Sequence, residues 1–386
     1  MKALYAAPGN PGIAQIAKCL EISDFLAAAE SIDADLTIVG PEAPLASGIV
    51  DRFREKHRAI VGPTAAAARI ESSKAFAKNF MVEAGIPTAR FITVDTIESA
   101  RLEARRFGYP VVLKADGLAA GKGVVIAKSR IDAEEAIPGL LSPGARLVIE
   151  EFLQGEEASF IALTDGSHIV PLEPTQDHKA IFDHDRGPNT GGMGAYCDGR
   201  IITAAQHREV MERVMHPAVD AMRRAGQPFT GFLYAGLILT GQGIKVLEFN
   251  ARLGDPETQV LMHRMRSDFV PFLRAAAKGE LKGENLEWHT DSSVCVVMAA
   301  AGYPGSVRSG DPIAGIAEVD RGVVFHAGTK LVNNVLKTAG GRVLGLTASG
   351  SDLGSAIQET YRQVEKIHFE GMQYRRDIGR KGLRRW

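Results

Sequence analysis

Short apolar runs alternate with helical patterns through about the first 66 residues, and this alternation restricts the fold of the chain more than any other feature. In order, these segments are residues 3–6, 25–31, 36–39, 49–56 and 59–61. Strands that alternate with helices predict a parallel sheet. Because ligands of such sheets lie at the carboxyl ends of the strands, we expect Glu42, which follows a predicted strand, to be a substrate residue. An acid that stabilises a helix N-terminus is an equally good interpretation.

Composition and charge narrow the class of protein. A length of 386 residues suggests two to three domains, and 45% hydrophobic with 24% charged residues is ordinary for a globular protein. The net charge of -1 gives no general basic field, so we expect no nucleic-acid partner. Lys and Arg cluster at residues 375–385, which we interpret as a solvated basic tail.

Neither a disulfide framework nor a membrane anchor is indicated. The cysteines Cys19, Cys197 and Cys295 are odd in number and widely spaced, which argues against both disulfides and a zinc site. The longest apolar run, residues 294–301, is too short to cross a bilayer, and the N-terminal residues lack the apolar region of a signal peptide. We therefore expect a cytoplasmic protein without membrane contact.

A predicted buried strand near residue 246 ends in polar residues that share one face. Glu248, Asn250 and Arg252 alternate along it, so their side chains point the same way. The two oxygen ligands suit Mg²⁺, with Mn²⁺ as an alternative, and Mg²⁺ usually arrives with phosphates. An arginine beside such an ion indicates an anionic substrate or a transferring phosphoryl group. A strand end with a surface ion pair is the simpler alternative.

A glycine-rich loop follows the predicted strand that ends at Lys114. It contains Gly117, Gly121, Lys122 and Gly123. Glycines let backbone N–H groups surround phosphate oxygens, and the lysines add positive charge. The spacing is one residue short of a Walker A loop and lacks its hydroxyl residue, so a P-loop kinase is disfavoured. An ordinary hairpin turn is the alternative.

The order of strand, lysine, glycine loop, strand and later Glu-x-Asn resembles the ATP-grasp superfamily, in which two α+β units clamp a nucleotide. The resemblance implies a hinge whose backbone reads adenine, an acid for the ribose, and two phosphate-binding lysines. The matching residues are Glu150, Glu151, Phe152 and Leu153 for the hinge, Glu157 for the ribose, and Lys74 and Lys114 for the phosphates. Residues 231–240 lack the second metal-binding acid of several members, so a second Mg²⁺ would depend on nucleotide and water oxygens.

Six motifs narrow the resemblance to the glycinamide ribonucleotide synthetase family, the phosphoribosylamine–glycine ligases. They occupy residues 40–45, 114–123, 176–179, 187–196, 248–257 and 325–330. The resemblance implies an α/β and α+β multidomain protein with an ATP-grasp fold. Its expected parts are an N-terminal parallel α/β substrate domain at 1–66, an ATP-grasp domain at 67–283 with a mobile lid at 85–155, and a small α+β C-terminal domain at 290–386.

The resemblance also implies a reaction of purine biosynthesis. ATP would phosphorylate the carboxylate of glycine, and the amine of 5-phosphoribosylamine would attack the acyl phosphate to give glycinamide ribonucleotide, ADP and phosphate. Glu248 and Asn250 would hold the metal, while Arg252 and Lys114 would act in catalysis. The implied substrate residues are Glu42, Asp177, Lys179, Asn189, Thr190, Gly191, Gly192, Arg252, Gly254 and Asp255.

Three further expectations accompany this assignment. Residues 189–192 are expected to form an anion-binding backbone nest, and His178 and His326 to make structural hydrogen bonds rather than act in catalysis. We expect a monomer, with a dimer as the alternative.

The start of the chain departs from the family pattern. A strand and a Gly-Gly-Arg-Glu-His-Ala loop normally precede the segment that matches residues 5–12, so we expect an N-terminal domain truncated at its first strand and helix. The alternative functions are then an ATP-binding protein with impaired ligase activity, or another ATP-grasp carboxylate–amine ligase.

Overall fold

The N-terminal segment forms two small parallel sheets instead of the single sheet expected. The computed structural model describes residues 2–118, 123–283 and 285–384. In the first sheet β1 (Tyr5–Ala6) pairs with β2 (Lys18–Cys19), and in the second β3 (Thr37–Ile38) pairs with β4 (Ile60–Val61). β2 is exposed and polar, so the apolar pattern of the sequence gave no sign of it.

Helices of this segment begin at side-chain caps or at turns. The Asp24 carboxylate accepts hydrogen bonds from the Leu26 and Ala27 N–H groups at the start of α1, and the Thr64 hydroxyl accepts one from Ala67 N–H at the start of α4. The helical elements here are η1 (Ile13–Gln15), α1 (Phe25–Ser31), α2 (Glu42–Ala46), α3 (Ile49–Glu55) and α4 (Ala65–Ser72).

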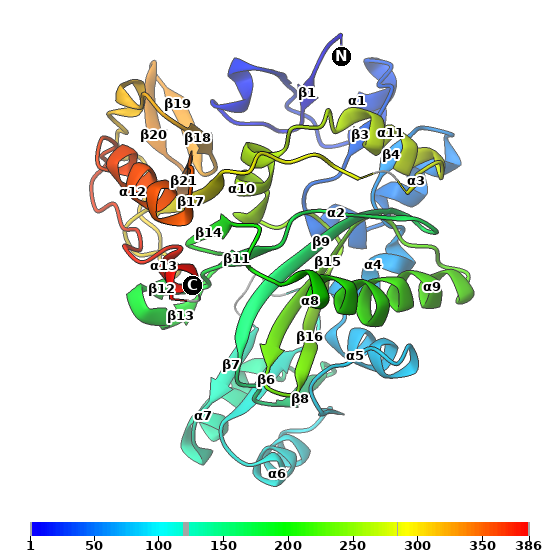
Figure 1. Cartoon of the computed structure of the whole chain (residues 1–386). Coiled ribbons are helices and arrows are strands. Elements are labelled where there is room, and N and C mark those ends of the chain that lie inside the picture. The colour runs from blue at the N-terminus through cyan, green and yellow to red at the C-terminus, as the bar shows by residue number, and fades with distance from the viewer. Residues whose placement is uncertain (1, 119–122, 284, 385–386) are drawn as a thin grey trace.

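One large antiparallel sheet runs through the middle of the molecule (Figure 1). Within the described residues it has nine strands, and it joins strands from the centre of the chain to strands near its end. Its order is β16 (Gly243–Asn250), β15 (Thr230–Thr240), β9 (Glu156–Asp165), β11 (Thr175–Asp177), β14 (Gly194–Cys197), β17 (Ser292–Ala299), β21 (Arg342–Gly350) and β18 (Val323–His326), with β10 (Ile169–Pro171) beside β9.

Both faces of this sheet are covered, which explains the nearly continuous apolar strands. Phe160 and Ala162 of β9 pack in one hydrophobic cluster, and Ile161 and Leu163 pack in another, as the alternation of a strand requires. Helices α8 (Ala204–Val210) and α9 (His216–Arg224), joined by the π-helical turn η3 (Met211–Met215), cover the first face. α10 (Glu257–Arg264) and α11 (Val270–Lys278) cover the second.

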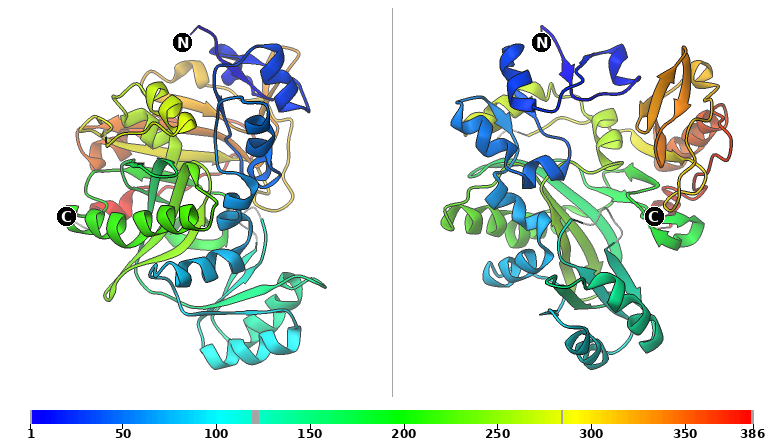
Figure 2. Two further views of the ribbon diagram at one scale, coloured as in Figure 1. Left: turned by 90° about the vertical axis from the view of Figure 1, so that its right-hand side faces the viewer. Right: turned by 180° about the vertical axis from the view of Figure 1, so that it is seen from behind.

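A second antiparallel sheet forms a unit at one end of the molecule, opposite both the N-terminal segment and the last strands (Figure 2). Its order is β5 (Phe91–Val94), β8 (Leu147–Glu151), β6 (Val111–Ala115) and β7 (Val124–Ala127). Helices α6 (Ile97–Phe107) and α7 (Arg130–Leu140) supply its separate hydrophobic cluster, and α5 (Lys74–Glu83) leads into it. Gly121 and Lys122 of the glycine-rich loop lie outside the described residues.

The remaining elements surround the far end of the large sheet. They are the hairpins β12 (Ala180–Phe182) with β13 (Arg186–Asn189) and β19 (Thr329–Val332) with β20 (Val335–Thr338), the short turns η2 (Asp183–Asp185) and η4 (Ile316–Glu318), and helices α12 (Leu353–Val364) and α13 (Arg380–Leu383). None of the described helices is long and apolar enough to cross a membrane.

The interpretation of residues 375–385 as a solvated tail is wrong for Arg375, which is 1% exposed. Its guanidinium pairs with Asp377 at 2.7 Å and Asp185 at 3.0 Å, and donates to the Ala180 carbonyl oxygen at 3.1 Å. A composition-based interpretation could not detect this role, because one of its acids lies 190 residues away in sequence.

Candidate active site

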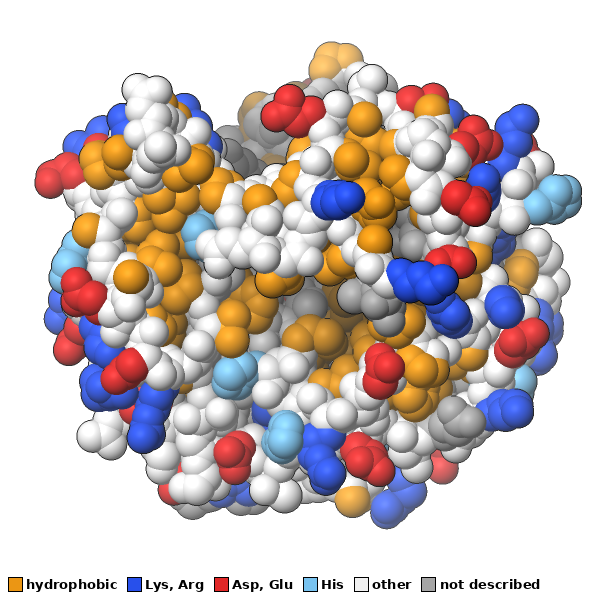
Figure 3. All heavy atoms as spheres, turned by 90° about the horizontal axis from the view of Figure 1, so that it is seen from above, with side chains coloured by type: hydrophobic (Ala, Val, Ile, Leu, Met, Phe, Trp, Pro, Cys, Tyr) orange, Lys and Arg blue, Asp and Glu red, His pale blue; other side chains and the backbone are white. Residues whose placement is uncertain are grey.

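A single large cavity brings together most of the residues expected from the sequence. It has a volume of about 1510 Å³ and is lined by the N-terminal segment, the four-stranded unit and both ends of the large sheet. Seen from above, the molecular surface is hollowed near its middle, with hydrophobic side chains around part of the hollow (Figure 3). The expected residues that line the cavity are Glu42, Lys74, Lys114, Gly117, Gly123, Glu150, Glu151, Phe152, Leu153, Glu157, Asp177, Lys179, Asn189, Thr190, Gly191, Glu248, Asn250, Arg252, Gly254 and Asp255. Gly192 is buried behind this lining.

The lysines at one part of the cavity are held by a buried carboxylate. Glu150 pairs with Lys114 at 2.9 Å and with Lys78 at 2.7 Å, and Lys114 also donates to the Leu247 carbonyl oxygen at 3.1 Å. Lys74 donates to the Gly117 carbonyl oxygen at 2.7 Å, beside the glycine-rich loop. The lysines place positive charge at the cavity wall, where nucleotide phosphates could bind. Because the Glu150 carboxylate is occupied by Lys78 and Lys114, only the backbone of Glu150 could contact a nucleotide base.

Lys78 also lines the cavity and was not predicted from the sequence. It lies one helical turn after Lys74 on α5, so both face the same side. Burial lowers the pKa of Lys78 to about 8, although Glu150 opposes this shift. The i to i+4 spacing of the two lysines was the available signal.

The end of β16 presents the expected metal ligands. Burial by itself would raise the pKa of Glu248, but Lys179, Lys114 and Lys74 outweigh it and lower the pKa overall. A carboxylate that stays ionised among cations suits a divalent ion that arrives with anionic phosphates. The described residues contain no group of three or more His, Cys, Asp or Glu that could hold a metal. A metal held by Glu248 and Asn250 would therefore share its remaining ligands with nucleotide and water.

Arg252 is clamped between two carboxylates from different helices. Its guanidinium lies 3.2 Å from Glu42 and 3.4 Å from Glu71, and it donates to the Leu253 carbonyl oxygen at 3.1 Å. Both interpretations of Glu42 therefore apply, because it starts α2 and also faces the cavity. Glu71, which also lines the cavity, was not predicted from the sequence. It accepts a hydrogen bond from Ala251 N–H at 2.7 Å, and burial raises its pKa to about 7 even though Arg252 lowers it in part.

Lys179 lies close to two acidic side chains on the other side of the cavity. Its ammonium lies 3.3 Å from Glu157 and 3.7 Å from Glu248. Burial raises the pKa of Asp177 to about 7, partly opposed by Lys179. Lys179 also pairs with Glu157, so a ribose hydroxyl at Glu157 would have to share this carboxylate.

The loop at residues 189–192 does not form the expected anion-binding nest. Three successive N–H groups already have acceptors: Thr190 N–H donates to the Lys179 carbonyl oxygen at 2.8 Å, Gly191 N–H to the Tyr303 hydroxyl at 3.1 Å, and Gly192 N–H to the Thr190 hydroxyl at 3.0 Å. The acceptor Tyr303 is 112 residues away, so local sequence could not reveal it. The loop still lines the cavity through Asn189, Thr190 and Gly191.

The expectation of structural hydrogen bonds is met by His326 and not by His178. His326 meets the hydrogen-bond part of the expectation, because its Nδ1 lies 3.0 Å from the Thr329 hydroxyl. The expectation is wrong for His178, whose two ring nitrogens are buried without a hydrogen-bond partner among the described residues. Burial, followed by Arg375 and Lys381, lowers the pKa of His178 to about 3, so the ring stays neutral. A neutral ring beside Tyr196 fills space in the core.

Family comparisons cover almost the whole chain. The family models described as phosphoribosylglycinamide synthetase N domain, ATP-grasp (A) domain and C domain match residues 1–71, 72–258 and 293–381. Because the N-domain model matches from residue 1, the comparisons do not support the expectation of a truncated N-terminal domain.

Full-length relatives and solved structures agree with these models. Phosphoribosylamine–glycine ligases from Yersinia pestis and Escherichia coli O157:H7 are 48% and 47% identical to this chain, covering 99% and 100% of it and 93% and 94% of their own lengths. The crystal structure of the Thermotoga maritima phosphoribosylamine–glycine ligase superposes with a TM-score of 0.84 at 34% identity, covering 97% of this chain and 94% of that one. N5-carboxyaminoimidazole ribonucleotide synthetase from the same organism shares the fold, with a TM-score of 0.66 at 19% identity over 95% of this chain and 92% of that one.

Proposed function

Since this chain belongs to the phosphoribosylglycinamide synthetase family, we propose that it joins glycine to 5-phosphoribosylamine at the expense of ATP, releasing ADP and phosphate. The observation that carries the proposal is one cavity with two chemically different parts. One part holds the lysines around Glu150, and the other holds Arg252 between its two carboxylates. Such a cavity can place a nucleoside triphosphate beside a small carboxylate.

In the nucleotide part, Lys74 and Lys114 would contact the phosphates. The Glu150 carboxylate holds the Lys114 ammonium at 2.9 Å, and both residues line the cavity. Glu248 and Asn250 would hold Mg²⁺, which supplies charge neutralisation across the phosphates when it is bound. Hinge recognition of adenine by residues 150–153 remains part of the proposal, because these residues line the same cavity.

In the acceptor part, the chemistry requires an activated carboxyl group. A carboxylate is a poor electrophile because its leaving group would be oxide, and transfer of the γ-phosphoryl group to it creates a better one. Arg252 would stabilise negative charge on the transferring group or on the glycine carboxylate. Without substrate, the Glu42 and Glu71 carboxylates hold the Arg252 guanidinium at the cavity wall.

The acyl phosphate must then be kept from water until the amine attacks. The four-stranded unit at residues 85–155 is the proposed lid, because it carries Lys114 and Gly117 over the cavity. Once neutral, the amine needs little further activation, so no catalytic role is proposed for His178. The proposed compartment is the reducing cytoplasm, since Cys19, Cys197 and Cys295 are free.

A phosphate-release assay tests the function. Purified protein is mixed with Mg-ATP, glycine and freshly made 5-phosphoribosylamine, and each substrate is omitted in turn. We expect release only with the complete mixture, together with the appearance of glycinamide ribonucleotide by mass spectrometry. Equal release without 5-phosphoribosylamine, or release with another amine in its place, would point to a different ATP-grasp ligase.

A further inference from the structure

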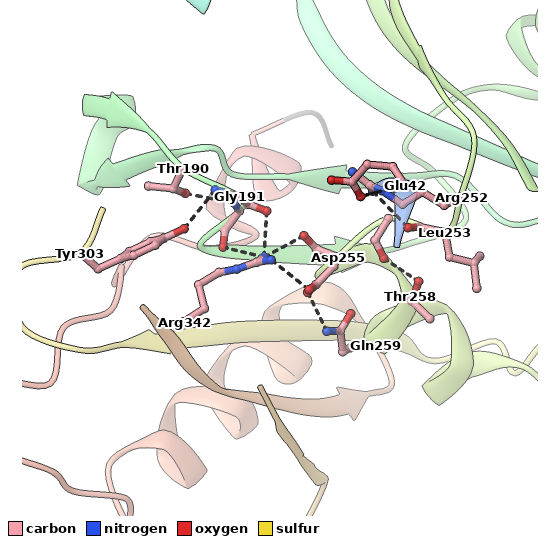
Figure 4. A network of polar contacts seen from close by, with 12 residues as sticks. Glu42, Thr190, Gly191, Arg252, Leu253, Asp255, Thr258, Gln259, Tyr303 and Arg342 are labelled. Carbon is pink, nitrogen blue, oxygen red and sulfur yellow. Dashed lines mark hydrogen bonds and ion pairs between the residues drawn. The ribbon is translucent and has the colours of Figure 1, made fainter. Parts of the chain in front are cut away.

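Arg342 lies outside the residues of the ATP-grasp domain. Its side chain contacts two loops of the cavity wall, one containing Gly191 and Gly192 and the other containing Asp255. It begins β21 and donates to the main-chain oxygens of Gly191 at 2.8 Å and Asp255 at 2.9 Å, with the Gly192 oxygen at 3.4 Å. Its second terminal nitrogen pairs with the Asp255 carboxylate at 2.9 Å. Figure 4 shows these bonds converging on one guanidinium. Arg342 belongs to the residues matched by the C-domain model, and the two loops belong to those matched by the A-domain model.

The close packing of the two loops depends on missing side chains. A Cβ atom on Gly191 would lie 3.1 Å from the Arg342 Cζ, and one on Gly192, whose φ is +114°, would lie 2.6 Å from the Pro256 Cδ. The loops therefore meet through their backbones, and the guanidinium covers the junction. Tyr303 adds a second contact from the same C-terminal residues, because its hydroxyl accepts from Gly191 N–H at 3.1 Å.

Each loop is linked, through hydrogen bonds or directly along the chain, to a charged side chain of the acceptor part of the cavity. The main chain and hydroxyl of Thr190 both donate to the Lys179 carbonyl oxygen at 2.8 Å. Two residues after Asp255, Glu257 starts α10, and its carboxylate accepts from the Tyr234 hydroxyl at 2.6 Å. A displacement of either loop would therefore move Lys179 or Glu257, both of which line the cavity.

We propose that Arg342 is a positioning residue that fixes the acceptor part of the cavity, so that its loss weakens the binding of glycine and 5-phosphoribosylamine much more than the binding of Mg-ATP. The inference rests on the proposed function. Its own contacts do not include Lys74, Lys114 or Glu248. Of the two side chains coupled to the loops, Lys179 is the one that lies near the nucleotide part, 3.3 Å from Glu157 and 3.7 Å from Glu248. Only a planar guanidinium has enough fixed donors to serve three main-chain oxygens and a carboxylate together.

The test compares Arg342→Met, Arg342→Lys and Tyr303→Phe with the wild type. The matched control is Arg308→Met, because Arg308 is an exposed arginine of the same C-terminal residues that pairs with Asp311 at 3.0 Å. Steady-state rates are measured with each substrate varied in turn, and Mg-ATP binding is measured by calorimetry without the other substrates. Melting temperatures show that each variant is folded.

For Arg342→Met we expect KM for glycine and for 5-phosphoribosylamine to rise about tenfold or more, on the scale of one or two lost charge-assisted hydrogen bonds. The KM and Kd for Mg-ATP should stay within about twofold of wild type. Arg342→Lys should resemble Arg342→Met, because one ammonium cannot reach all four acceptors, and Tyr303→Phe should shift the same constants less.

Three outcomes would overturn the inference. They are unchanged KM values in a folded Arg342→Met protein, a parallel loss of Mg-ATP binding, or wild-type behaviour of Arg342→Lys. Failure of the proposed function is a separate result, because the wild type itself would then not turn over glycine and 5-phosphoribosylamine.

Discussion

Replacing Glu71 by Gln should change how the stability of the protein depends on pH. The Glu71 side chain is 8% exposed, and burial raises its pKa from 4.5 to about 7. The folded state therefore holds a proton on Glu71 at pH values where the unfolded chain has released it. The stability from this group is fully present below about pH 4.5 and is lost as the pH rises through about 7.

The size of the effect follows from the shift. At about 1.4 kcal/mol for each pH unit, a rise from 4.5 to about 7 corresponds to about 3 kcal/mol. A Gln side chain cannot titrate, so Glu71→Gln should gain up to about 3 kcal/mol of stability relative to wild type between pH 4.5 and pH 8. Any constant loss from the contact with Arg252 cancels in this comparison.

The assay is urea unfolding of the metal-free protein at four pH values from 4.5 to 8. Glu83→Gln serves as the control, because Glu83 is an exposed glutamate at the end of α5. We expect the stability difference from wild type to vary with pH for Glu71→Gln and to stay flat for Glu83→Gln. A flat difference for Glu71→Gln would refute the reasoning, since Glu71 would then have the same pKa in the folded and unfolded states.

The remaining predictions concern the nucleotide part of the cavity. Glu248→Gln should lower turnover strongly with little change in melting temperature, because it removes a charged metal ligand and preserves volume; near wild-type turnover at saturating Mg²⁺ would show that Glu248 is not a ligand. Glu150→Gln should destabilise the fold by about 3–5 kcal/mol, because Lys78 and Lys114 would lose their shared counter-charge; urea unfolding measures this, and a loss below about 1 kcal/mol contradicts it. Chelation of divalent ions should stop turnover and leave the circular dichroism spectrum unchanged, because the described residues contain no group of three or more His, Cys, Asp or Glu that could form a structural metal site; unfolding by the chelator would contradict this expectation.

Sequence motifs predicted the cavity-lining residues well where those residues lie at strand ends or in glycine-rich turns. Alternation along β16 places Glu248 and Asn250 on one face, and the glycine-rich loop after a predicted strand indicated Lys114, whereas Lys74 was predicted only from the family resemblance. These features depend on residues close in the chain, so local patterns describe them adequately.

The features that were missed depend on long-range contacts. Glu71 meets the segment at Ala251 across 180 residues, and Arg342 meets Gly191 across 151. The nest predicted at 189–192 failed for the same reason, since Tyr303 takes one of its donors. Periodicity and motif spacing carry no information about such partners, because they describe only the neighbourhood of each residue.

The shared sheet also limits how this protein can be divided or recombined. β14 pairs with β17 over four residues, from Gly194 with Val296 to Cys197 with Ser293, and this is the seam between central and C-terminal strands. Cutting the chain between them would leave two buried strands with open edges, which favour aggregation. A chimera that takes its C-terminal part from a relative must therefore preserve the register of this seam as well as the contacts of Arg342. Recombination within the family is then expected to succeed when β14 and β17 are exchanged together.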